Sequence, residues 1–175
     1  MLKMFSTTAN KITLFRIILV PVFLLFAYTD RLRWALVVYI IASVSDFADG
    51  YIARNYNQIS ETGKFLDPLA DKMLVASAMC YFIGSGQMSG WCVAAVLFRE
   101  FAVSGLRLIA VEKGRVIAAA WSGKIKTAAT MVCLGAMLLF PDHGIFNRLC
   151  SAVILITTVY SGIEYFIKNK DVLKA

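Results

Sequence analysis

Four aspartates lie close together in a chain that is otherwise strongly apolar. Asp46 and Asp49 are three residues apart, and Asp67 and Asp71 are four apart. On a helix, either spacing places two side chains on one face about one turn from each other. A carboxylate at membrane depth is costly unless it is paired, solvated or bound to a cation. The four aspartates therefore predict a functional site.

Two facing pairs of carboxylates would form a cage of oxygen ligands. Four negative charges in a cleft of low dielectric need cations, and an oxygen-only ligand set favours hard divalent metals such as Mg²⁺ or Mn²⁺. We expect two ions that share a bridging carboxylate. Such a pair can hold the attacking and leaving oxygens of a phosphoryl displacement.

Two glycines and an arginine accompany the aspartates. Gly50 follows Asp49 directly, and Gly63 opens the next apolar segment. Without a Cβ at these positions, a bulky diphosphate can come close to the backbone and the metals. Arg54, about one turn after Gly50, can hold a phosphate oxygen through its guanidinium group. Each glycine alone is more typical of a helix-packing contact, but the combination indicates a phosphate site.

Composition indicates an all-α integral membrane protein. The chain has 175 residues, of which 59% are hydrophobic and 17% charged, and a mean hydropathy of +0.71. This length allows one domain over residues 1–175, with a short N-terminal juxtamembrane segment and about six spans of ~20 residues. The predicted spans are residues 12–28, 34–56, 63–84, 89–111, 117–140 and 146–168.

The charged residues within these spans lie in the halves that share one side of the membrane. They occupy the C-terminal half of the second and fourth spans and the N-terminal half of the third and fifth. Because consecutive spans run antiparallel, this pattern predicts a polar cavity open on one side. Most of the remaining Lys and Arg fall on the same side, which places the cavity and both termini in the cytoplasm of a cell-membrane protein. The net charge of +7 is not gathered in a patch of the kind that binds nucleic acid.

The segment from residue 46 to residue 71 resembles a known enzyme family. It fits the signature D-x2-D-G-x2-A-R-x8-G-x3-D-x3-D of the CDP-alcohol phosphotransferases at every spacing. The matching residues are Asp46, Asp49, Gly50, Ala53, Arg54, Gly63, Asp67 and Asp71. The resemblance implies a six-helix membrane enzyme, usually a homodimer, in which the hydroxyl of an acceptor alcohol displaces CMP from a CDP-linked donor.

The same resemblance implies roles for these residues. All four aspartates would hold the two metals, while Asp49, Gly50, Ala53, Arg54 and Gly63 would accommodate the CDP-linked lipid. Asp71 would be the general base, or else a metal ligand only. Near the start of the chain, Asn10, Thr13 and Arg16 fit the N-x-x-T-x-x-R element of the family, which adds Asn10 and Thr13 to the donor site. Ala9 departs from the proline that is common before this asparagine.

Two further segments are similar to the bacterial phosphatidylglycerophosphate synthases of this family. They are residues 99–107, which begin Arg-Glu and end Gly-Leu-Arg, and residues 123–127, Gly-Lys-Ile-Lys-Thr. A phosphorylated acceptor needs cations, and we expect Arg99, Arg107, Lys124 and Lys126 to bind its phosphate. The alternative for the two lysines is snorkelling to the interface. Glu100 is expected to pair with an arginine rather than to react.

The expected reaction transfers the phosphatidyl group of CDP-diacylglycerol to glycerol 3-phosphate and releases CMP. Inositol phosphate, serine or phosphatidylglycerol remain as alternative acceptors. A cation-coupled transporter, which also carries carboxylates at membrane depth, is a distant alternative. Transporters of that kind typically show inverted repeats and discontinuous helices, and the sequence shows neither.

Overall fold

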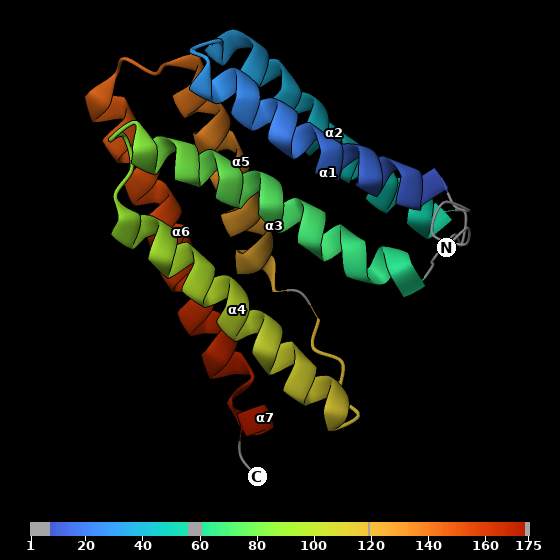
Figure 1. The fold of residues 1–175 in the computed structure, drawn as a ribbon. Coiled ribbons are helices and arrows are strands. Elements are labelled where there is room, and N and C mark those ends of the chain that lie inside the picture. The colour runs from blue at the N-terminus through green and yellow to red at the C-terminus, as the bar shows by residue number, and fades with distance from the viewer. Residues whose placement is uncertain (1–7, 56–60, 119, 174–175) are drawn as a thin grey trace. The chain divides into compact units, whose positions relative to one another are not determined.

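The computed structural model describes the backbone of residues 8–55, 61–118 and 120–173, and the side chains of residues 12–45, 69–70, 72–118 and 120–172. Over these residues the chain is all-helical, with six long helices and one short one (Figure 1). They are α1 (Thr8–Tyr28), α2 (Leu32–Asn55), α3 (Glu61–Gly84), α4 (Gly90–Glu112), α5 (Trp121–Leu139), α6 (Gly144–Lys168) and α7 (Lys170–Leu173). Each predicted span overlaps one long helix.

The fifth helix begins four residues later than predicted, at Trp121 instead of Ile117. The reason lies at the end of α4, where Gly114 adopts a left-handed conformation with φ of 69°. The Gly114 N–H donates to the carbonyl of Val111, and the Arg115 N–H donates to the carbonyl of Ala110. This is the Schellman arrangement, which satisfies the last carbonyls of a helix and turns the chain away. Ile117 then packs against a hydrophobic cluster instead of entering a helix.

Helix α6 is long and apolar enough to cross a membrane. Among the residues whose side chains are described, shorter apolar stretches run over Ile12–Tyr28, Leu32–Ser45 and Lys72–Gly84.

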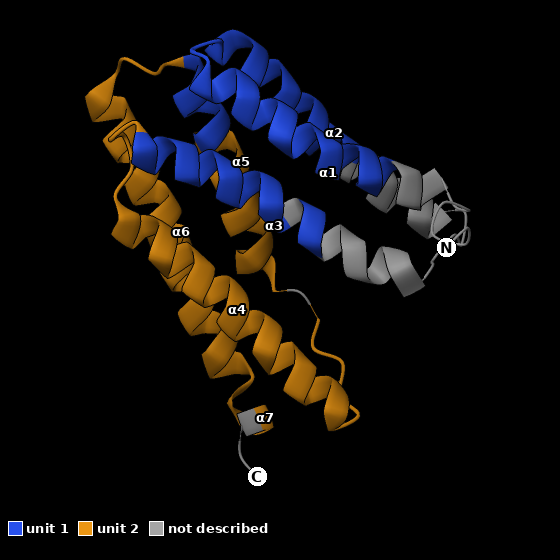
Figure 2. Cartoon of the chain, viewed as in Figure 1, with its two compact units in different colours: residues 1–84, 134–139 blue, residues 85–133, 140–175 orange. Residues whose placement is uncertain are grey.

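The chain divides into two compact units (Figure 2). Unit 1 contains α1, α2, α3 and residues 134–139 of α5. A tight turn with Asp30 at φ of 57° joins α1 to α2, and α1 packs against both α2 and α3. Aromatic contacts line this packing: the rings of Phe23 and Tyr39 lie 6.0 Å apart, and those of Tyr28 and Tyr81 lie 5.5 Å apart. Unit 1 thus brings the two aspartate-bearing helices into one packed group.

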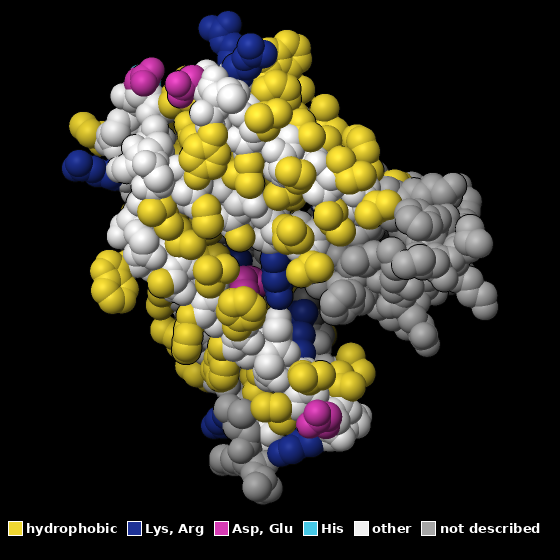
Figure 3. Space-filling model, viewed as in Figure 1, with side chains coloured by type: hydrophobic (Ala, Val, Ile, Leu, Met, Phe, Trp, Pro, Cys, Tyr) yellow, Lys and Arg dark blue, Asp and Glu magenta, His cyan; other side chains and the backbone are white. Residues whose placement is uncertain are grey.

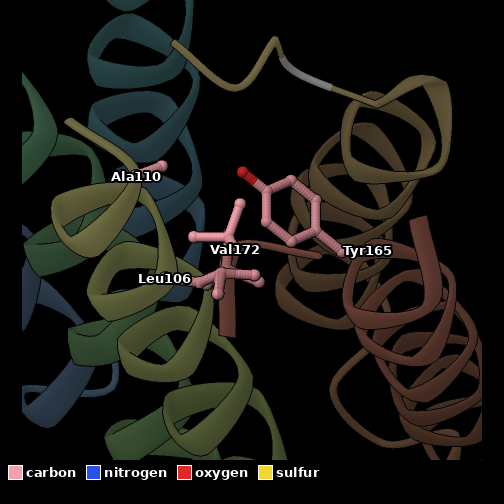
Figure 4. Packing of buried hydrophobic residues seen from close by; sticks show 5 residues of the cluster. Leu106, Ala110, Tyr165 and Val172 are labelled. Carbon is pink, nitrogen blue, oxygen red and sulfur yellow. The ribbon is translucent and has the colours of Figure 1, made fainter. Parts of the chain in front are cut away.

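Unit 2 contains α4, the first part of α5, α6 and α7, and α4 packs against α6. Its core is a hydrophobic cluster of Val103, Leu106, Ala110, Tyr165 and Val172 (Figure 4). In the close-up, the Tyr165 ring of α6 reaches toward Val172 and toward Leu106 of α4. The cluster joins α4, α6 and α7 through the C-terminal half of α4, which includes part of the predicted acceptor-binding segment.

Large apolar side chains are exposed over much of the surface (Figure 3). On α6 the outward-facing residues include Ile156, Val159 and Ile163, with exposed fractions of 46% or more. A soluble protein rarely leaves so many large apolar side chains exposed to water, whereas lipid accommodates them. The surface of the described residues agrees with a membrane environment.

Candidate active site

The aspartate motif lies on α2 and α3. Helix α2 carries Asp46, Asp49, Gly50, Ala53 and Arg54, and α3 carries Gly63, Asp67 and Asp71. The helical backbone confirms that each aspartate pair has a spacing of about one turn. The side chains of these eight residues lie outside the described ones, as does that of Asn10. The carboxylate cage therefore stays a prediction, and its oxygen-only donor set fits a hard divalent cation.

Among the described side chains, no group of three or more His, Cys, Asp or Glu residues lies close enough to hold a metal. Helices α2 and α3 also contact each other directly within unit 1. The aspartates on these two contacting helices stay the predicted metal ligands.

Two residues of the N-x-x-T-x-x-R element face the interior of unit 1. Thr13 is fully buried, and Arg16 is 1% exposed. They are three residues apart on α1 and so share a face of that helix. A buried arginine is rare without partners, and Arg16 has interactions of its own in this structure. This placement agrees with a polar role for α1 at the donor site.

Glu100 is the centre of a charged cluster in unit 2. Its Oε1 atom accepts hydrogen bonds from Arg99 Nη1 at 3.0 Å and from Lys126 Nζ at 2.6 Å. The side chains of Arg99, Glu100 and Lys126 are 12%, 21% and 6% exposed. The expectation that Glu100 pairs with an arginine is confirmed, and a lysine from α5 joins the same oxygen. We call these three residues the Glu100 cluster.

Arg99 passes through a narrow space between α5 and α6. Its Nη2 atom donates to Ser161 Oγ at 2.7 Å. A Cβ placed on Gly123 would lie 3.3 Å from Nη2, and a Cβ placed on Gly162 would lie 3.2 Å from Arg99 Cγ. Both distances are shorter than ordinary van der Waals contact. The two glycines therefore make room for the arginine, and Ser161 fixes its guanidinium group.

Arg107 lies two turns after Arg99 on α4 and has a different partner. Its Nε atom donates to the hydroxyl of Tyr165 at 2.9 Å, and its guanidinium carbon lies 5.6 Å from the centre of the same ring. Tyr165 is 1% exposed and belongs to the core of unit 2, whereas Arg107 is exposed. A buried tyrosine thus holds the orientation of an exposed arginine.

Lys124 is exposed and lies over the ring of Trp121, with Nζ 4.8 Å from the ring centre. This contact is typical of a lysine and a tryptophan at a membrane interface. Lys126, two residues later, is on a different face and is buried. The structure therefore joins Arg99 and Lys126 through Glu100, while Arg107 and Lys124 make separate contacts.

Three residues of α6 that support these cations were not predicted from the sequence. They are Ser161, Gly162 and Tyr165, which lie on one side of the helix by their spacing. The adjacent small residues Ser161 and Gly162 are a signal of close helix approach in a membrane protein. That signal indicates close packing, but not which side chain fills the space.

Comparison with known proteins identifies the family. A family model described as CDP-alcohol phosphatidyltransferase matches residues 6–163. The chain is 40% identical over 189 residues to the CDP-diacylglycerol–glycerol-3-phosphate 3-phosphatidyltransferase of Bacillus subtilis (strain 168), covering 94% of this chain and 96% of that protein. The protein of the same name from Escherichia coli (strain K12) is 40% identical over 168 residues, covering 88% and 90%. A probable phosphatidylglycerophosphate synthase of Mycobacterium tuberculosis (strain H37Rv) is 36% identical over 171 residues, covering 91% and 80%. The chain belongs to the CDP-alcohol phosphatidyltransferase family.

Proposed function

We propose that this protein transfers the phosphatidyl group of CDP-diacylglycerol to glycerol 3-phosphate, releasing CMP and forming phosphatidylglycerophosphate. The observation that carries the proposal is the 40% identity, over most of both chains, to two relatives whose names state this reaction. The cationic side chains on α4 and α5 support it, because the acceptor carries a phosphate.

The metals and the donor are assigned to the motif on α2 and α3. The family is metal-dependent, and Asp46, Asp49, Asp67 and Asp71 would hold two divalent cations, Mg²⁺ or Mn²⁺. When bound, these ions would neutralise the diphosphate and the charge that develops as CMP leaves. The residues assigned to CDP-diacylglycerol are Asn10, Thr13, Asp49, Gly50, Ala53, Arg54 and Gly63.

The acceptor is assigned to unit 2. Arg99 and Lys126 are the principal ligands for its phosphate, because they are adjacent and largely shielded from solvent. Charged hydrogen bonds are stronger in such surroundings than in water. Arg107 and Lys124, which are both exposed, would add to the attraction at the entrance.

The chemical step needs one proton transfer and one displacement. Asp71 would accept the proton of the primary hydroxyl of glycerol 3-phosphate. The resulting oxygen forms a bond to the lipid-side phosphorus, the bond from that phosphorus to CMP breaks, and CMP leaves with the electron pair. Arg99 and Lys126 hold the acceptor by its phosphate during this exchange, which makes the reaction one of positioning as well as charge stabilisation.

The proposal includes the arrangement in the membrane. All six long helices would span a cell membrane as a single domain, with both termini and the site on the cytoplasmic side, and the enzyme would be a homodimer. The family to which the chain belongs acts on membrane lipids, and the surplus of Lys and Arg on one side supports this orientation.

The test is CMP release by the purified protein in detergent with CDP-diacylglycerol, Mg²⁺ and a panel of labelled acceptors. We expect turnover with glycerol 3-phosphate and little with inositol phosphate, serine or phosphatidylglycerol. Faster turnover with any of these would replace the proposed acceptor. Turnover without an ion gradient would also exclude the transporter, and removal of divalent metal by a chelator should stop the reaction.

A further inference from the structure

We propose that Glu100 is a positioning residue for the acceptor: its carboxylate holds Arg99 and Lys126 side by side so that both cations meet one phosphate group. This inference rests on the proposed function, because it assigns a task within the acceptor site. It adds a residue of negative charge to a site that otherwise needs only positive charge.

The first support is the geometry of the cluster. Arg99 and Lys126 come from different helices and are 27 positions apart in the sequence. Both bind the same oxygen of Glu100, at 3.0 and 2.6 Å. A single acceptor atom thus fixes the separation of the two cationic groups. The separation matters because a phosphate offers its oxygens at fixed distances from one another.

The second support is the rigid frame around Arg99. Its guanidinium group donates to both Glu100 and Ser161, and its aliphatic part fills the space left by Gly162. Arg99 is therefore held from three sides. Because Glu100 is bound to this fixed arginine, its carboxylate has a defined place from which to orient Lys126.

The third support is the burial of Lys126. The residue is 4% exposed, and an ammonium group so far from water is unfavourable without a neighbouring negative charge. Glu100 supplies that charge. Two cations and one carboxylate leave the cluster with one net positive charge, which complements a phosphate and gives little gain to an uncharged acceptor. We infer that Glu100 keeps Lys126 charged and in place for the substrate.

Kinetics of Glu100→Gln and Glu100→Asp with each substrate varied in turn test the proposal. Glu112→Gln is the matched control, because Glu112 lies on the same helix and is exposed at its end. Loss of a charged hydrogen bond predicts that Glu100→Gln raises KM for glycerol 3-phosphate about tenfold or more. KM for CDP-diacylglycerol and kcat should stay within about threefold, since the variant affects binding of the acceptor alone. Glu100→Asp should recover part of the loss, and Glu112→Gln should match the wild type.

Three results would overturn the assignment. They are an unchanged KM for glycerol 3-phosphate in Glu100→Gln, an equal rise in KM for both substrates, or a loss confined to kcat. If Glu100→Gln does not purify as a folded protein, Glu100→Asp decides, because its shorter side chain keeps the charge but moves it. An Asp variant with wild-type KM for glycerol 3-phosphate then refutes the proposal. Failure of the proposed function is distinct, because the wild-type protein itself would not use glycerol 3-phosphate.

Discussion

The Glu100 cluster predicts strong energetic coupling between two helices. The perturbation is a double-mutant cycle of Glu100→Gln, Lys126→Met and the two together. Glu100→Gln removes the carboxylate and leaves the ammonium group of Lys126 buried, with a side chain only 6% exposed. Lys126→Met removes the ammonium group, but Glu100 keeps its hydrogen bond from Arg99. The two single variants therefore leave different groups behind.

The expected sizes follow from these remaining partners. Breaking a buried ion pair by removing one partner costs about 3–5 kcal/mol, which is the expectation for Glu100→Gln. Losing one charged hydrogen bond to Glu100 costs about 1.5–3 kcal/mol, which is the expectation for Lys126→Met. In the double variant neither charge remains, so its loss should be less than the sum by about 1.5–3 kcal/mol. For a chain of this length, Glu100→Gln alone should lower Tm by roughly 6–20 °C.

The assay is thermal and denaturant unfolding of all variants in one detergent, followed by circular dichroism. Glu112→Gln combined with Lys126→Met is the control cycle, and its effects should add within about 0.5 kcal/mol. A coupling energy between Glu100 and Lys126 of about 0.5 kcal/mol or less would refute the reasoning. It would mean that the ion pair between Glu100 and Lys126 contributes nothing to the stability of the fold.

Three further predictions concern other parts of the chain. Asp46→Asn or Asp67→Asn should abolish CMP release from a folded protein, and activity within about tenfold of wild type at saturating Mg²⁺ would contradict the metal assignment. Arg107→Gln should raise KM for glycerol 3-phosphate by the equivalent of about 1.5–3 kcal/mol without changing KM for CDP-diacylglycerol. If neither KM changes, the role of Arg107 is limited to its hydrogen bond with Tyr165. Gly114→Ala should lower the free energy of unfolding by about 1–2 kcal/mol, because Gly114 has a φ of 69°. The control Gly105→Ala, at a position with open space around it, should leave that free energy unchanged or raise it by up to about 1 kcal/mol. Equal effects of the two substitutions would contradict the role of the left-handed backbone at Gly114.

Hydropathy and turn residues predict the helices well because these signals are local. The connector after Gly84 contains Gly86 in the left-handed conformation, and the bounds of α3 agree with prediction within two residues. The start of α5 was predicted too early because hydropathy does not distinguish an apolar helix from an apolar segment packed on a core. Residues 117–120 are apolar in sequence, and Ile117 and Ala120 pack on the hydrophobic cluster of unit 2 without forming a helix.

The sequence by itself determined the class of chemistry. Residue types and short spacings within one segment are enough to specify an aspartate motif on two helices and to identify the family. Tertiary structure decided how the cations are arranged: it joined Lys126 to Glu100, joined Arg99 to Ser161, and gave Arg107 a separate partner in Tyr165. These contacts link residues 26 to 62 positions apart. The partner of each cation depends on which faces of α4, α5 and α6 meet. Those faces are determined by the packing of side chains between helices, which local sequence spacing does not specify.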